Sequence, residues 1–214
     1  MKTTKIYNLI ILDESGSMNC IKTQTLNGFN ETIQTIASAQ RRFPEQNHLV
    51  TLVSFNSELI KTICELTPVV KLAQLTSKTY LPDAGTPLFD ALGISLSKLR
   101  SQINKEEDHQ VIVTVITDGA ENASLEFSES MIKQMIDELK SMGWVFTFIG
   151  ANIDVEKVAT QISINNYINF NQNAQGTKAM FEKESSSRMN FFDKMSKGTS
   201  KKDLSDKYFD ENNQ

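Results

Sequence analysis

Three short segments of the sequence carry side chains of the kind that bind a hard metal ion. They read Asp-Glu-Ser-Gly-Ser, Gly-Thr-Pro and Thr-Asp-Gly, in that order along the chain. Together they supply two carboxylates and three hydroxyls, from Asp13, Ser15, Ser17, Thr86 and Asp118. Oxygen ligands without a nearby imidazole or thiolate favour Mg²⁺, Mn²⁺ or Ca²⁺ over Zn²⁺. The residue types therefore predict a site for a hard divalent cation.

The spacing within the first segment suits such a site. A two-residue separation allows both serine hydroxyls to turn to the same side, and Gly16 between them permits a tight turn without a Cβ clash. Two carboxylates balance the charge of a divalent cation, whereas neutral hydroxyls donate little charge. A cation held in this way stays Lewis acidic, and it would accept a further carboxylate at an open position.

Each segment also has an ordinary structural explanation when it is taken alone. Asp13 and Ser15 are common helix-capping residues, Asp118-Gly119 is a common turn, and Pro87 after Thr86 suits the first position of a helix. These explanations leave the co-occurrence of three such segments as a coincidence. The set as a whole favours a common site.

The elements around these segments are expected to bring them together. Residues 5–12 and 111–116 are apolar, β-branched runs typical of buried parallel strands, and they end next to Asp13 and Asp118. Thr86 stands directly before a leucine-marked helix that begins at about Pro87. Because ligands of open α/β sheets bind at the carboxyl ends of the strands, the three segments should meet at one edge of the sheet.

The rest of the sequence alternates between strand and helix patterns. We expect strands at 49–55, 59–64, 144–149 and 167–170, and helices at 21–39, 128–139, 151–162 and 174–197, with a loop and a short helix at 69–81. This order predicts an α/β fold: a doubly wound, mostly parallel central sheet, Rossmann-like, with helices on both faces and one antiparallel edge strand. Residues 1–197 should form a single domain, and residues 198–214 a polar, mobile tail apart from Tyr208 and Phe209.

Composition narrows the functional class. The chain has 214 residues, 39% of them hydrophobic, and a formal net charge of −4, which argues against a nucleic-acid binder. Cys20 and Cys64 form no CxxC motif, so reduced thiols in the cytoplasm are expected. We find no signal-peptide pattern and no apolar run long enough to cross a bilayer, so no membrane association is expected.

The three segments resemble the von Willebrand factor A (VWA) family and its metal-ion-dependent adhesion site (MIDAS), over roughly the first three quarters of the chain. The family pattern is an Asp-x-Ser-x-Ser loop, a separate Thr and a separate Asp, and all five positions are filled here. The resemblance implies that the serines and Thr86 contact the metal, taken to be Mg²⁺, with Mn²⁺ or Ca²⁺ as alternatives. It implies that the aspartates act directly or through water, and that an Asp or Glu of a protein partner completes the coordination. Glu14, Gly85 and Glu121 are then expected to form the partner-binding rim.

These considerations favour a cytoplasmic, bacterial-type interaction module over an enzyme. Stress-response, tellurite-resistance and ATPase-associated systems use similar domains. The alternative is a metal-dependent phosphotransferase or hydrolase of the haloacid dehalogenase type, which also places an Asp after its first strand. That class has a second acid two residues later, where this chain has Ser15, and it needs a lysine that the Thr86 loop lacks.

Overall fold

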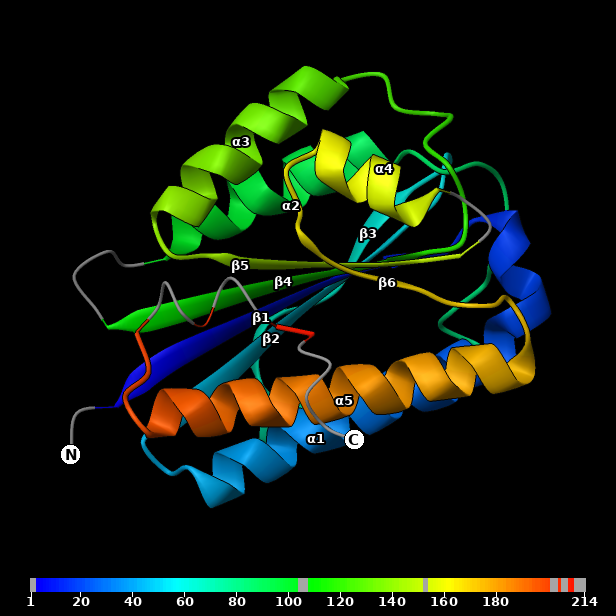
Figure 1. The fold of residues 1–214 in the computed structure, drawn as a ribbon. Coiled ribbons are helices and arrows are strands. Elements are labelled where there is room, and N and C mark those ends of the chain that lie inside the picture. The colour runs from blue at the N-terminus through cyan, green and yellow to red at the C-terminus, as the bar shows by residue number, and fades with distance from the viewer. Residues whose placement is uncertain (1–2, 104–107, 152–153, 201–203, 205–207, 210–214) are drawn as a thin grey trace.

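The computed structural model describes residues 3–103, 108–151, 154–200, 204 and 208–209. Its strands form one sheet in the order β3-β2-β1-β4-β5-β6 (Figure 1). Every neighbouring pair is parallel except β2 and β3, which are antiparallel at one edge. The strands are β1 (Thr4–Asp13), β2 (Gln46–Phe55), β3 (Ile60–Pro68), β4 (His109–Thr117), β5 (Val145–Gly150) and β6 (Asn166–Asn169).

Helices cover both faces of the sheet (Figure 1). One layer contains α1 (Lys22–Arg42) and α5 (Ala174–Ser196), which lie side by side. The opposite layer contains α2 (Leu88–Gln102), α3 (Glu129–Ser141) and α4 (Val155–Gln161). The predicted doubly wound α/β fold with one antiparallel edge strand is confirmed.

The burial of β1 explains why its residues form the uninterrupted apolar run that is typical of a central strand. Leu9 and Ile11 are buried in the core under α2 and α3, whereas Ile10 and Leu12 are buried in the core under α1 and α5. A strand that is covered on both faces needs apolar side chains at consecutive positions. The uninterrupted apolar run before Asp13 is the result.

The order of the strands fixes where the predicted ligands lie. The chain leaves β1 toward β2 on one side and only later places β4 on the other, so the strand order reverses between β1 and β4. Parallel pairing brings Leu12 opposite Ile116, and the carboxyl ends of β1 and β4 therefore lie next to each other. The loops that follow Asp13 and Thr117 share this edge of the sheet, as the sequence predicts.

Some local features differ from the expectations. The segment after Asp13 is not only a loop, because residues Gly16–Ile21 form a 3₁₀ helix, η1. Residues 69–81 contain one 3₁₀ turn, η2 (Val69–Lys71), and otherwise irregular backbone. Within the expected tail, Leu204 and Tyr208 are buried in the core that α1 and α5 cover. The remainder of residues 201–214, apart from Phe209, lies outside the described residues.

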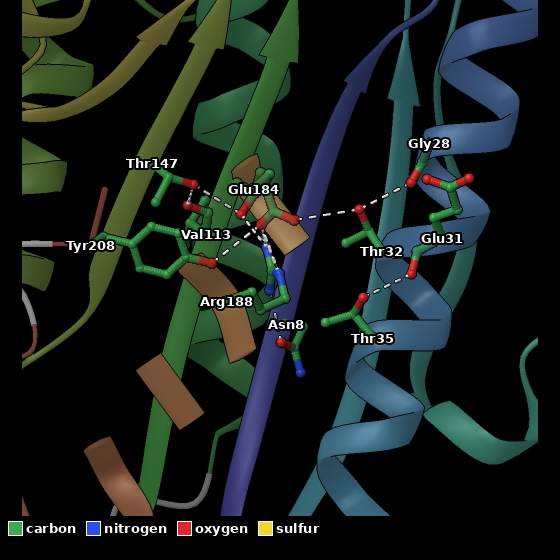
Figure 2. A network of polar contacts seen from close by, with 11 residues as sticks. Asn8, Gly28, Glu31, Thr32, Thr35, Val113, Thr147, Glu184, Arg188 and Tyr208 are labelled. Atoms are coloured by element: carbon green, nitrogen blue, oxygen red, sulfur yellow. Dashed lines mark hydrogen bonds and ion pairs between the residues drawn. The ribbon is translucent and has the colours of Figure 1, made fainter. Parts of the chain in front are cut away.

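A buried ion pair within α5 is hydrogen-bonded to the centre of the sheet (Figure 2). The Arg188 side chain has no exposed surface, and its Nε donates to Glu184 Oε1 at 2.7 Å. Its Nη1 donates to Asn8 Oδ1 of β1 at 3.0 Å, and its Nη2 to Thr114 Oγ1 of β4 at 2.7 Å. Tyr208 donates its hydroxyl to Glu184 Oε1 at 3.2 Å. We call these five residues the Arg188 network; they fix α5 against β1 and β4.

Candidate metal centre

Asp13 ends β1 and is fully buried. Its Oδ1 accepts a hydrogen bond from the backbone N–H of Ser15 at 2.7 Å, and its Oδ2 accepts one from the Thr117 hydroxyl at 2.6 Å. The hydroxyl of the buried Tyr80 donates to the main-chain oxygen of Asp13 at 2.7 Å. Both the carboxylate and the backbone of Asp13 are thus held in one orientation.

The two serines of the first loop connect to Asp118. Ser15 Oγ and Ser17 Oγ lie 3.2 Å apart, and the Ser17 hydroxyl donates to Asp118 Oδ1 at 2.5 Å. A hydroxyl that donates its proton to a carboxylate keeps its lone pairs for another partner. The oxygen atoms of both serines are therefore arranged as acceptors beside an acidic group.

Thr86 is placed from the opposite side by Asn122. The backbone N–H of Thr86 donates to Asn122 Oδ1 at 2.9 Å, and the backbone N–H of Asn122 donates to the Thr86 carbonyl at 3.1 Å. A Cβ on Gly119 would lie 2.9 Å from Thr86 Oγ1 and 3.8 Å from Asp13 Oδ2. The Thr86 hydroxyl and the Asp13 carboxylate thus both border the same glycine. The structure brings all five predicted ligands to one edge of the sheet.

Within the described residues, no cationic side chain is paired with either of the two carboxylates. Burial raises the pKa of Asp13 to about 6, although hydrogen bonds from Thr117 and Ser15 act in the opposite direction. The nearby Asp118 raises the Asp13 pKa further, and burial also raises the pKa of Asp118 itself. Among the described residues, no ion pair joins either aspartate to a Lys, Arg or His side chain.

This donor set fits a hard divalent cation. A pair of buried carboxylates would be relieved of both desolvation and mutual repulsion by a cation between them. In the part of the chain that the structure describes, no group of three or more His, Cys, Asp or Glu side chains is arranged to hold a metal. Coordination here would instead use Asp13 and Asp118 together with the hydroxyls of Ser15, Ser17 and Thr86.

The expected rim residues have structural roles that the sequence did not indicate. Although acidic residues in loops are usually solvated charges, the carboxylates of Glu14 and Glu121 are both bound to backbone groups. Glu14 is 8% exposed, and its carboxylate accepts the backbone N–H of Leu81. Glu121 accepts three backbone N–H groups at 2.8–2.9 Å, from Phe89, Ala123 and Ser124. The assignment of these two residues and Gly85 to a partner-binding rim stays a prediction.

Several residues around the centre were not singled out from the sequence. Thr117 orients Asp13, and Asn122 positions Thr86. Asp90 in the first turn of α2 accepts the backbone N–H groups of residues 125–127 and so fixes the loop after β4. Gln172, which precedes α5, donates its side-chain amide to Asp118 Oδ2. Thr117 belongs to the Thr-Asp-Gly segment and Asn122 follows Asp118 by four positions, so their closeness to a predicted ligand could have pointed to them, whereas no sequence pattern pointed to Gln172.

Solved structures share the fold. The VWA domain of SpRpn10 matches with a TM-score of 0.54 and 11% identity, over 83% of this chain and 94% of that one. The pilus adhesin SpaC from Lactobacillus rhamnosus GG matches with a TM-score of 0.59 and 13% identity, over 90% of this chain and 30% of the adhesin. Manganese-loaded TRAP protein of Plasmodium vivax matches with a TM-score of 0.54 and 18% identity, over 84% and 72%.

The lengths of these proteins differ widely. This chain spans 46% of proximal thread matrix protein 1 from the mussel byssus, which matches with a TM-score of 0.54 and 14% identity over 87% of this chain. No curated protein sequence matches the chain. The model of the von Willebrand factor type A domain matches residues 9–192, which include all five predicted ligands. With this match and the observed fold, the chain belongs to the VWA family.

Proposed function

We propose that this protein binds an acidic side chain of a protein partner through a divalent cation held by Asp13, Ser15, Ser17, Thr86 and Asp118. The observation that carries the proposal is the convergence of two buried carboxylates and three hydroxyls, where no cationic side chain in the described part of the chain pairs with the carboxylates. In VWA domains such a site is a MIDAS. We propose Mg²⁺ as the ion, with Mn²⁺ or Ca²⁺ as alternatives.

The charges of the ligands explain why a partner carboxylate would be accepted. Asp13 and Asp118 together carry two negative charges, and the three hydroxyls carry none. A divalent cation in this site supplies Lewis acidity toward a further oxygen ligand. The side chains of this protein hold and orient the site, and the partner contributes the last carboxylate.

Family membership supports a binding role rather than a catalytic one. VWA domains are generally interaction modules, and one of the matching structures is a manganese-loaded protein. Neither the family match nor the structures described above supports the haloacid dehalogenase alternative. We therefore propose that the protein is not an enzyme.

The cellular setting is proposed by analogy alone. We propose a bacterial, cytoplasmic protein in a stress-response, tellurite-resistance or ATPase-associated system, with no nucleic-acid partner. None of the helices in the described part of the chain has the length and apolar character that a membrane span requires. Glu14, Gly85 and Glu121 are proposed to lie at the edge of the partner interface.

A calorimetric titration with Mg²⁺ and Mn²⁺ tests the metal site. Asp118→Asn keeps the shape of the side chain but removes its charge, and it should weaken binding at least tenfold. Asp83→Asn is the matched control, because Asp83 is an exposed acid of a neighbouring loop whose side chain accepts the backbone N–H of Ala84. It should bind like the parent protein.

Partner capture tests the bridging role of the cation. A captured protein should be released by a chelator and should not be retained by Asp118→Asn. A partner that stays bound in chelator contradicts the proposed bridge, and equal Mg²⁺ affinity in Asp118→Asn and the parent contradicts the site itself.

A further inference from the structure

One side chain from the last connection of the fold reaches into the candidate metal centre. Gln172 lies between β6 and α5, two residues before α5 begins. Its amide nitrogen Nε2 donates to Asp118 Oδ2 and, at 3.1 Å, to the backbone oxygen of Ser17. Both acceptors belong to proposed ligand residues. The α5 end of the molecule is therefore in direct contact with the centre.

The backbone turn around Gln172 is tightly fixed by its neighbours. Asn173 caps α5 by accepting the backbone N–H of Gly176 at 2.8 Å, and its own N–H donates to the Asn171 carbonyl at 2.7 Å. A Cβ at Gly176 would lie 2.3 Å from that carbonyl oxygen, so the turn accepts only glycine there. The Gln172 side chain starts from a defined position, and its contact with Asp118 is a property of the folded turn.

The two oxygens of Asp118 have different partners. Oδ1 accepts the Ser17 hydroxyl, which can keep this bond while its lone pairs face a cation. Oδ2 accepts the Gln172 amide, whose nitrogen has protons and no lone pair to offer. The N–H group places partial positive charge against the Asp118 carboxylate, and this charge opposes a divalent cation at the same carboxylate. The amide and the cation therefore compete for the negative charge of Asp118.

We propose that Gln172 is an internal competitor at the metal centre: its amide binds Asp118 Oδ2 in the metal-free protein and releases it when a divalent cation binds. This inference rests on the proposed function. It makes the affinity for the cation lower than the five ligands alone would give. It also makes occupancy of the centre depend on the conformation of the residue that precedes α5.

Two substitutions remove the competitor in different ways. Gln172→Ala deletes the amide, and Gln172→Asn keeps an amide but shortens its reach by one methylene. Because hydrogen bonds to charged groups are among the stronger ones in proteins, both variants should bind Mg²⁺ about tenfold more tightly. Asn173 is untouched, so the cap of α5 is retained.

Cys20→Ala is the matched control. The Cys20 thiol donates to the same backbone oxygen of Ser17, at 3.1 Å, and no hydrogen bond to Asp118 is found for it among the described residues. If loosening of the Ser17 backbone were the cause of tighter binding, this variant would show the same gain. We expect its Mg²⁺ affinity to equal that of the parent protein.

The experiment is a calorimetric Mg²⁺ titration of the full chain and the three variants, repeated with Mn²⁺ and with free Mn²⁺ counted by electron paramagnetic resonance. Circular dichroism verifies that each variant is folded. Tighter binding in both Gln172 variants and unchanged binding in Cys20→Ala support the inference. Equal or weaker binding in the Gln172 variants overturns it, as does an equal gain in Cys20→Ala.

The outcomes separate this inference from the proposed function. If the parent binds the cation and the Gln172 variants bind it no more tightly, the competition by Gln172 is contradicted and the metal site is still supported. Absence of binding in the parent and in all variants contradicts both. Binding by the Gln172 variants alone supports both, and shows that the amide blocks the centre in the parent protein.

Discussion

The candidate metal centre and the Arg188 network are two polar clusters built on the same pair of strands. β1 and β4 contribute Asn8 and Thr114 to the network, within the strands, and they carry Asp13 and Asp118 at or just beyond their carboxyl ends. The network contains its own cation, Arg188, whereas none of the Lys, Arg or His side chains that the structure describes forms an ion pair with the two carboxylates of the centre. The comparison shows that this fold can pair a buried charge internally, and that, among the described residues, no ion pair does so for the carboxylates at the edge of the sheet.

The pKa values express the same difference. Burial lowers the pKa of Arg188, but the charge of Glu184, the influence of Tyr208 and the hydrogen bond to Glu184 together outweigh burial, so the pKa of Arg188 is raised. At the centre, burial is the largest influence on the pKa of Asp13 and raises it to about 6. In the Arg188 network, an ion pair stabilises the charged form of Arg188. Among the described residues, no ion pair stabilises the charged form of Asp13.

The largest expected effect is the removal of the internal cation. Arg188→Met leaves the Glu184 carboxylate buried without its partner, and the free energy of unfolding should fall by about 3–5 kcal/mol. Urea unfolding measures the change. The double variant Glu184→Gln/Arg188→Met removes both charges and should recover a large part of the loss. A loss below about 1 kcal/mol in the single variant would mean that Arg188 does not compensate the buried charge.

In the presence of a chelator, Asp13→Asn should raise the free energy of unfolding, whereas Arg188→Met lowers it. The pKa of Asp13 is raised from 3.8 to about 6 on folding, so the folded state binds the proton more tightly than the unfolded chain. The stability that this supplies is complete below the unfolded pKa and is lost as the pH rises through the folded one. Relative to the parent, the variant should therefore gain about 3 kcal/mol between about pH 4 and 7.

Denaturant unfolding across this pH range, with and without Mg²⁺, measures the effect. Saturating Mg²⁺ should restore the stability of the parent at the upper end of the range and should not affect Asp13→Asn. If the difference between the two proteins does not change with pH, Asp13 is not the uncompensated charge that the comparison requires.

A smaller effect is expected from Asn122→Ala, which removes the acceptor for the Thr86 backbone N–H. Stability should fall by about 1 kcal/mol, and Mg²⁺ affinity should fall several-fold because Thr86 loses its support. Asn30→Ala is the control, since Asn30 exchanges two similar hydrogen bonds with the backbone of Leu75 away from the centre. It should lose similar stability and no affinity, and an equal loss of affinity in both would contradict the positioning role.

The smallest effect is expected from Tyr208→Phe. This change removes one hydrogen bond to Glu184 Oε1 and leaves the Arg188–Glu184 pair intact. Thermal unfolding should show a loss of roughly 1 kcal/mol, with Mg²⁺ affinity unchanged. A change in affinity would show that the two clusters are coupled.

The two clusters also differ in how far the sequence predicted them. The metal ligands follow directly on apolar strands or precede a leucine-marked helix, so the local pattern placed Asp13, Thr86 and Asp118 at one edge of the sheet. The network left no such pattern. Asn8 and Thr114 are single polar residues inside apolar runs, and Arg188 lies on a helix that reads as polar. Only the packing of α5 against the sheet decides which of its charges become buried.

The same limit explains what was missed around the centre. The carboxylates of Glu14 and Glu121 bind backbone N–H groups of loops whose conformations no local pattern specifies. Gln172 meets Asp118 across more than fifty positions of sequence, through a turn that depends on the start of α5. Contacts of this kind need the assembled tertiary structure.

The Arg188 network also sets an order of events for a chain made from its amino-terminal end. All five proposed metal ligands have been synthesised by residue 118, but the cation that pairs with Glu184 arrives only with residue 188. Before α5 is synthesised, Asn8 and Thr114 have no guanidinium group to accept hydrogen bonds from. The same face of the sheet also lacks the Phe181 and Phe192 side chains that pack against it. A chain that stops before α5 would carry every proposed ligand but would lack both the Arg188 guanidinium and the apolar side chains of α5 that complete the core on this face of the sheet.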